Sequence, residues 1–134
     1  MKLVSFDQVK LEDVNIEGAL GTGIRWLISQ KDNAPNFALR MFEVKPGGNT
    51  PFHKHAWEHE VFVLEGEGAL VLQGETKPFK RYDSIYVDPE MMHQFRNEGD
   101  TTMKFLCIVP HQTPAEAPKK KAKNPFASGT ANNC

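Results

Sequence analysis

Histidine is the residue type whose spacing in this chain could do chemistry. The chain has five histidines in 134 residues, and three of them, His53, His55 and His59, lie within the segment HKHAWEH. A fourth, His93, opens the segment HQFRN. Neutral imidazole nitrogens are common ligands of divalent transition metals. We therefore predict one divalent metal ion held by His53, His55, His59 and His93.

A β-strand at the first cluster would bring its imidazoles together. Side chains alternate along a strand, so His53 and His55 would point to one face and Lys54 to the other. The gap before His59 allows a bend, and His93 would come from a different hairpin. A lone histidine is more often a surface or hydrogen-bonded core residue. Clustered imidazoles in an apolar interior repel when protonated and lack partners when neutral, and a cation satisfies them together.

The expected ligand set limits what the ion can do. Four neutral imidazoles leave its dipositive charge in place, so it should attract an anion such as hydroxide, superoxide, enolate or carboxylate. Imidazole suits Zn, Cu, Fe and Ni, so the ligands alone do not choose the metal. An octahedral ion with four protein ligands keeps two open positions, for a substrate and dioxygen or for a bidentate substrate.

Short β-type runs must position these ligands. Between residues 24 and 110 such runs are separated by Gly, Pro, Asn or Asp, which predicts an all-β sandwich or barrel. The expected strands are 24–30, 37–45, 59–66, 68–74, 84–88 and 102–110, with shorter strands at 52–56 and 93–97. Gly66 and Gly68 accept the backbone angles of hairpin turns, which predicts that strands 59–66 and 68–74 are antiparallel neighbours.

Strand alternation also predicts the interior around the metal. If His59 faces inward, Val61 and Val63 follow it, while Glu60, Phe62 and Leu64 point outward. Residues 102–110 should direct Met103, Phe105, Cys107 and Val109 inward, and His93 shares its face with Phe95 and Asn97. We favour an interior face for Arg40 and Phe42, with a surface Arg40 as the alternative. The predicted substrate-binding residues are Arg40, Phe42, Trp57, Phe95, Phe105 and Cys107.

Length and composition predict one domain. A chain of 134 residues with 40% hydrophobic residues can form one core, which we divide into an arm (1–23), a barrel (24–110) and a flexible tail (111–134). A net charge of -1 argues against nucleic-acid or anionic-membrane partners. Only two cysteines and a charged N-terminal segment predict a cytoplasmic protein.

Several strands are apolar at nearly every position, which predicts that a partner subunit covers the outer face. We expect a homodimer whose surface carries Trp26, Ile28, Phe62 and Leu64. The arm residues Leu3, Val4 and Phe6 would add a strand to the partner's sheet.

The first histidine cluster resembles a known family motif. The pattern Gly47-x5-His53-x-His55-x3-His59-x6-Gly66 is similar to the first motif of the cupin superfamily, G-x5-H-x-H-x3/4-E-x6-G, with histidine in place of glutamate. Glu60 is the alternative counterpart of that glutamate, but it leaves the interval to Gly66 one residue short.

The second cupin motif, G-x5-P-x-G-x2-H-x3-N, is matched in part by YDSIYVDPEMMHQFRN. His93 and Asn97 fit it, Tyr82 stands for the first glycine, and Pro89 is one place late. Met91 replaces the second glycine. The span from Tyr82 to His93 is kept, so the ligand position is kept while the local turn must differ.

The resemblance covers about residues 24–110 and extends to small single-domain cupins with four histidines. It implies a jelly-roll barrel (a double-stranded β-helix), homodimer formation, and Mn or Fe as the metal, with Ni, Cu and Zn as alternatives. Three functions stay open. They are a dioxygenase acting on a small anionic or enolisable substrate, a non-catalytic binder of metal or small ligand, and a metal-dependent isomerase using Glu58 or Glu60.

Overall fold

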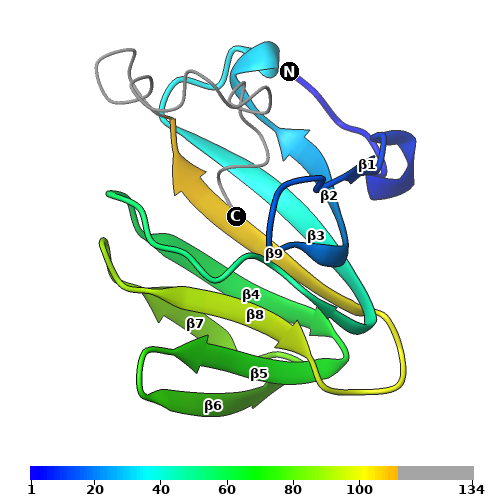
Figure 1. Ribbon diagram of the computed structural model, residues 1–134. Coiled ribbons are helices and arrows are strands. Elements are labelled where there is room, and N and C mark those ends of the chain that lie inside the picture. The colour runs from blue at the N-terminus through cyan, green and yellow to red at the C-terminus, as the bar shows by residue number, and fades with distance from the viewer. Residues whose placement is uncertain (112–134) are drawn as a thin grey trace.

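Residues 1–111 are the part of the chain that the computed structural model describes, and they form an all-β fold (Figure 1). The tail expected at 111–134 lies outside these residues, except for His111. The strands are β1 (Glu12–Asp13), β2 (Leu20–Ile28), β3 (Phe37–Asn49), β4 (His59–Glu65), β5 (Glu67–Leu72), β6 (Glu75–Lys80), β7 (Ser84–Val87), β8 (His93–Asn97) and β9 (Met103–Pro110). Two single-turn 3-10 helices, η1 (Phe6–Gln8) and η2 (Gln30–Asp32), complete the fold. Neither helix is long and apolar enough to cross a membrane.

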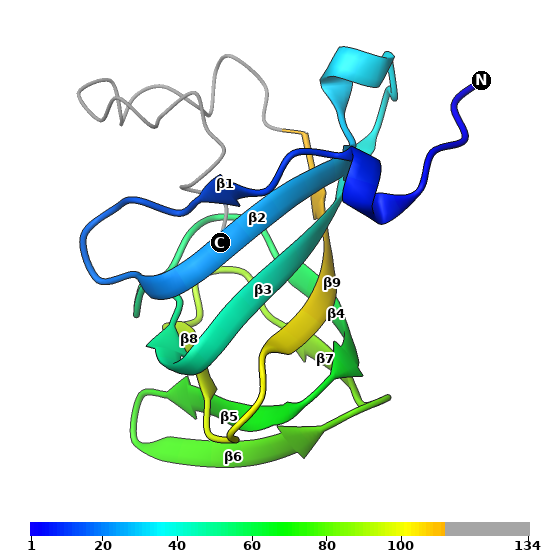
Figure 2. The ribbon, with the colours of Figure 1, turned by 90° about the vertical axis from the view of Figure 1, so that its right-hand side faces the viewer.

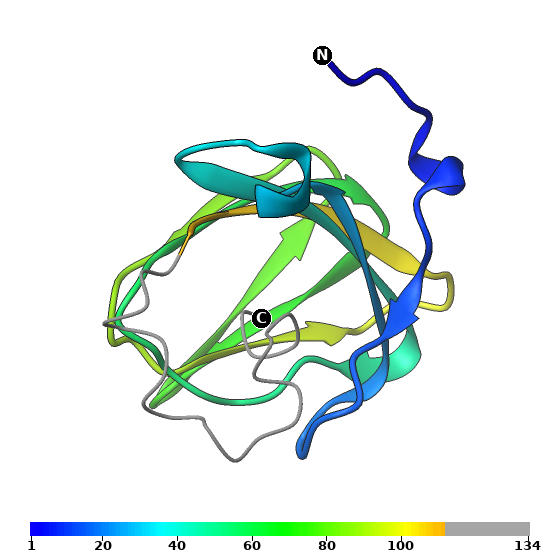
Figure 3. The same cartoon turned by 90° about the horizontal axis from the view of Figure 1, so that it is seen from above.

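One curled antiparallel sheet contains all the strands. Its hydrogen-bonded order is β6-β5-β8-β3-β9-β4-β7, with β2 on β3 and β1 on β2. Strands far apart in sequence are therefore neighbours, as Figure 2 shows for β3 and β9. Seen from above, the strands curve around a common interior (Figure 3). The predicted all-β barrel is confirmed.

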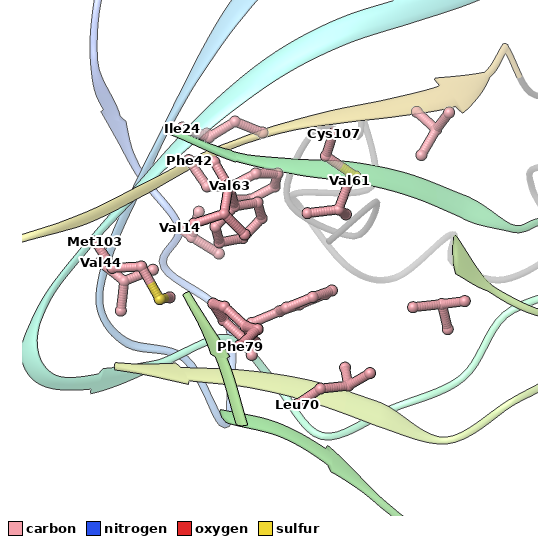
Figure 4. Packing of buried hydrophobic residues seen from close by; sticks show 14 of the residues in the cluster. Val14, Ile24, Phe42, Val44, Val61, Val63, Leu70, Phe79, Met103 and Cys107 are labelled. Atoms are coloured by element: carbon pink, nitrogen blue, oxygen red, sulfur yellow. The ribbon is translucent and has the colours of Figure 1, made fainter. Parts of the chain in front are cut away.

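Directly opposed residues on paired strands share one face, so the register arranges the interior in rows. One row joins Trp26, Arg40, Cys107 and Val61 across β2, β3, β9 and β4. The next row joins Ile24, Phe42, Phe105 and Val63. Burial alternates strictly along β8 and β9 and through most of β4, as predicted from the period of a strand. The side chains of this second row are all apolar and pack together inside the barrel (Figure 4).

Aromatic rings form a floor beneath the histidines. Phe42 and Phe105 stack with centroids 5.1 Å apart, and Phe95 lies 4.9 Å from Phe105. None of the three is more than 2% exposed. Burying a side chain of this size stabilises the fold by about 1.5–3 kcal/mol. The floor is therefore a major part of the core and fixes β8, the strand that carries His93.

The predicted hairpin between β4 and β5 is wrong. β4 pairs with β7 and β9, whereas β5 pairs with β6 and β8. Gly66 has a φ of 84°, and at this residue the chain passes from β4, which lies between β7 and β9, to β5, which lies between β6 and β8. Gly68 serves close packing, because a Cβ there would lie 2.4 Å from the Arg96 carbonyl oxygen.

The outward positions are confirmed only in part. Phe62 is 41% exposed, as expected for an outward position. Trp26 instead packs against the core, and its ring lies 5.4 Å from Arg40 Cζ. A register irregularity between Trp26 and Ile28 reverses the alternation, which leaves Ile28 42% exposed. In the arm, Phe6 lies under Arg25 of the same chain, 5.3 Å from its Cζ.

Candidate metal centre

Three of the predicted ligands come together at the end of β8. His53 and His93 face each other in an isolated antiparallel bridge, in which the His53 N–H donates to the His93 carbonyl (3.1 Å) and the His93 N–H donates back (2.9 Å). His55 follows two residues later. Candidate ligand atoms of His53, His55 and His93 all lie within 4.8 Å of one another. The expected short strand at 52–56 is reduced to this bridge, which is enough to bring the three imidazoles together.

Backbone carbonyls orient two of these imidazoles. His55 Nδ1 donates to the Trp57 carbonyl at 2.8 Å, and His93 Nδ1 donates to the Met91 carbonyl at 2.7 Å. A carbonyl oxygen can only accept, so in each neutral ring the proton is on Nδ1. The lone pair is then on Nε2, as a metal ligand requires, and the carbonyl fixes the orientation of the ring.

His59 begins β4 and is fully buried. Its Nε2 lies 3.0 Å from Nε2 of His55, and its ring centroid lies 5.0 Å from that of His93. Two imidazole nitrogens bound at right angles to one ion, each about 2.0–2.1 Å from it, are about 2.9 Å apart. This nitrogen-to-nitrogen spacing fits two imidazoles that bind one ion. The other side chains grouped here as candidate ligands, His53 and His93, are also imidazoles. A fourth ligand at His59 stays a prediction.

Behind His59 lies a buried sulfur and guanidinium group. Arg40 Nη2 donates to Cys107 Sγ at 2.9 Å, and this sulfur lies 3.1 Å from His59 Nδ1. Arg40 is completely buried, which confirms its predicted interior position. The rings of Phe42 and Trp26 lie 5.0 and 5.4 Å from Arg40 Cζ.

Burial raises the pKa of the Cys107 thiol, because the interior disfavours a thiolate. The charge of Arg40 and its hydrogen bond oppose this rise without cancelling it. Cys107 therefore carries its proton at neutral pH. A thiol can then both donate and accept a hydrogen bond at this position.

The aromatic candidates support the histidines. Trp57 is half-buried and stacks on His55, with ring centroids 4.4 Å apart and an interplanar angle of 9°. Phe95 lies 6.1 Å from His93, centroid to centroid, with Phe42 and Phe105 packed beyond it. Whether these rings, Arg40 or Cys107 contact a substrate stays a prediction.

Thr50 is a positioning residue that sequence reasoning missed. It is 2% exposed, its Oγ1 accepts the Phe95 N–H at 2.9 Å, and its own N–H donates to the Phe95 carbonyl at 2.9 Å. This exchange clamps the segment before His53 onto β8. The feature of the sequence that could have indicated this role is the position of Thr50, three residues before His53.

The second motif keeps its geometry without glycines. Tyr82 has a φ of 74° and Glu90 a φ of 65°, a region that glycine usually occupies. Counted back from His93, the second glycine position is therefore Glu90, and the assignment to Met91 is wrong. The Glu90 N–H donates to the His55 carbonyl at 2.7 Å, which ties this turn to the histidine cluster.

An antiparallel barrel with imidazoles converging over an aromatic floor defines a candidate metal-binding β-barrel protein. The chain belongs to the Cupin domain family, whose profile matches residues 40–109. The solved structure of the polyketide cyclase RemF from Streptomyces resistomycificus matches it with a TM-score of 0.80 and 41% identity, over 85% of this chain and 82% of that one.

Two curated proteins resemble parts of the chain. A 1-methylthio-D-xylulose 5-phosphate methylsulfurylase of Rhodospirillum rubrum is 35% identical over 71 residues, covering 53% of this chain and 46% of that protein. Polyketide synthase CurC of Streptomyces cyaneus is 35% identical over 64 residues, covering 47% of this chain and 42% of that protein. The chain therefore spans about half the length of the curated relatives it matches, or less.

Proposed function

We propose that this protein is a metal-dependent cyclase that closes a ring in a polycarbonyl, polyketide-type substrate. The observation that carries the class of chemistry is the convergence of His53, His55 and His93, with ligand atoms within 4.8 Å, over an apolar floor. The substrate class rests on the likeness to the polyketide cyclase RemF, which extends over most of both chains.

A bound divalent ion would act as a Lewis acid toward a carbonyl or enolate oxygen. His53, His55 and His93, with His59 as the proposed fourth ligand, would hold it without neutralising its charge. The Arg40 guanidinium, buried behind His59, adds a second positive charge that favours an anionic enolate. The aromatic floor formed by Phe42, Phe95 and Phe105 would keep water away from that side of the site.

Ring closure of this kind is redox-neutral. A proton leaves a carbon between two carbonyl groups, that carbon forms a bond to a distant carbonyl carbon, and the attacked oxygen takes up a proton to become a hydroxyl group. Loss of a second hydrogen from the same carbon together with this hydroxyl group then releases one water and leaves a carbon–carbon double bond. Neither dioxygen nor another oxidant is consumed.

The dioxygenase predicted from the sequence is not specifically supported by the comparisons with known proteins. Its products would contain oxygen atoms from dioxygen. The isomerase alternative would leave the substrate mass unchanged, and a binding module would leave the substrate intact. Product mass therefore separates the cyclase and the dioxygenase from the other two functions, and a changed chromatographic retention at unchanged mass separates the isomerase from the binding module.

The test is the reaction of metal-loaded protein with a synthetic linear tri- or tetra-β-carbonyl thioester, run in parallel without air and in air and followed by mass spectrometry. We expect a product lighter by one water, formed faster than with chelator-treated protein. Lys54→Ala, which changes the exposed residue between two ligands, is the matched control and should retain activity. A product that forms only in air and contains added oxygen would contradict the cyclase proposal.

We further propose that the protein is a homodimer through the outer face of β4, β7 and β9. A shallow apolar groove lies there, lined mainly by Leu39, Val61, Phe62, Ile85, Tyr86, Leu106 and Ile108. Phe62 and Tyr86 at this groove are 41% and 56% exposed. A second copy covering the groove would remove both rings from water.

A further inference from the structure

We propose that Cys107, held by Arg40, is the positioning residue for His59 in the candidate metal centre. The inference rests on the proposed metal-binding function, with His59 as a ligand. In this assignment the cysteine sulfur does at His59 Nδ1 what backbone carbonyls do at Nδ1 of His55 and His93.

The register of three strands makes this contact. Arg40 on β3 lies directly opposite Cys107 on β9, and Cys107 lies opposite Val61 on β4. His59 is two residues before Val61, so it shares the inward face of β4. Arg40 and His59 are fully buried and Cys107 is 2% exposed, so the contact is shielded from solvent.

The atoms in contact have complementary roles. If His59 offers its Nε2 lone pair to a cation, its proton must be on Nδ1, and that proton needs an acceptor. Cys107 Sγ lies 3.1 Å from Nδ1 and can accept. Arg40 Nη2, 3.5 Å from the same Nδ1, can only donate, so it cannot take the proton.

Arg40 instead fixes the acceptor. Its Nη2 donates to the same sulfur at 2.9 Å, and its guanidinium lies over the rings of Phe42 and Trp26. A sulfur without this contact could change rotamer, and the His59 ring would lose its fixed plane. Replacing groups that orient metal ligands in this way typically weakens metal binding by about 10-fold to 100-fold.

The experiment uses Co²⁺ as the probe, because its visible absorption reports the number and geometry of its ligands. Cys107→Val removes the acceptor while an apolar side chain still fills the space, and Cys107→Ser restores an acceptor. We expect Cys107→Val to change the Co²⁺ spectrum and weaken Co²⁺ binding by about 10-fold or more. Cys107→Ser should recover the wild-type spectrum. Val44→Ala, a buried truncation in the row beyond the phenylalanines, should lower the unfolding temperature and leave the spectrum unchanged.

Arg40→Met is a second variant should Cys107→Val fail to fold, and it should change the same absorption bands. If both variants fold and bind Co²⁺ like wild type, the positioning role is wrong while the metal centre stands. A sulfur-to-cobalt charge-transfer band in the wild-type protein would make Cys107 a ligand and would also overturn it. If wild-type protein binds no Co²⁺, the proposed metal centre and the positioning role both fail.

Discussion

Truncation of Phe95 to alanine should weaken the fold and the candidate metal centre together. Phe95 is 2% exposed and contacts three rings, with centroids 4.9 Å from Phe105, 6.2 Å from Phe79 and 6.1 Å from His93. Removing a fully buried phenylalanine costs about 3–5 kcal/mol, because both transfer energy and packing are lost. Domains of this size are stable by only about 5–15 kcal/mol. Phe95→Ala should therefore lose a large fraction of the total.

Urea unfolding followed by circular dichroism measures this loss as a fall in the transition midpoint. Phe37→Ala is the matched control, since Phe37 is 58% exposed at the start of β3, and it should cost less than about 1 kcal/mol. His93 shares β8 with Phe95, so Co²⁺ binding should weaken in Phe95→Ala and not in Phe37→Ala. Equal losses of stability in the two variants would refute the aromatic floor as the support of the site.

Three further outcomes follow from particular residues. Phe62→Glu should convert the proposed dimer to monomer in multi-angle light scattering, and a wild-type monomer at micromolar concentration would contradict the dimer. The Lys80 N–H bonds the Asp83 carboxylate and lowers its pKa below the ordinary 3.8, so this stabilisation is present above that value and is lost as pH falls through the lowered pKa. Thermal unfolding of Asp83→Asn should therefore show a smaller decline in acid than wild type. Cys107, with its raised pKa and 2% exposure, should resist iodoacetamide in a folded Cys134→Ser protein and react once urea unfolds the chain, and rapid native labelling would contradict this.

The interior faces could be predicted from sequence because strand alternation has an exact period. The inward sets His59, Val61 and Val63 on β4, and Phe105 and Cys107 on β9, are buried as expected. Alternation fails where the strand is irregular. Trp26 and Ile28 have the same parity, yet the register irregularity between them places the first against the core and the second outside.

Pairing between strands could not be read from local signals. Two glycines near the end of β4 favour a hairpin, but Gly66 redirects the chain and Gly68 admits the Arg96 carbonyl. β6 was missed because only Phe79 among its residues is buried, which leaves no apolar alternation to detect.

The candidate site could likewise be predicted where its residues are close in sequence and could not be predicted where they are far apart. The ligands were identifiable because His53, His55 and His59 lie within one short segment. The contact from Arg40 through Cys107 to His59 joins residues up to 67 positions apart, and only the register of β3, β9 and β4 brings them together. Thr50 acts through a similar cross-strand contact with Phe95, 45 residues away.

Metal stoichiometry tests the central claim most directly. The measurement is elemental analysis of protein purified without a chelating tag, for wild type, His55→Ala, His59→Ala and the control Lys54→Ala. We predict one divalent transition metal ion per chain in wild type and Lys54→Ala, and a sharp loss in both histidine variants. Metal-free wild-type protein that also fails to take up added metal, or equal metal content in all four proteins, would contradict a histidine-held ion.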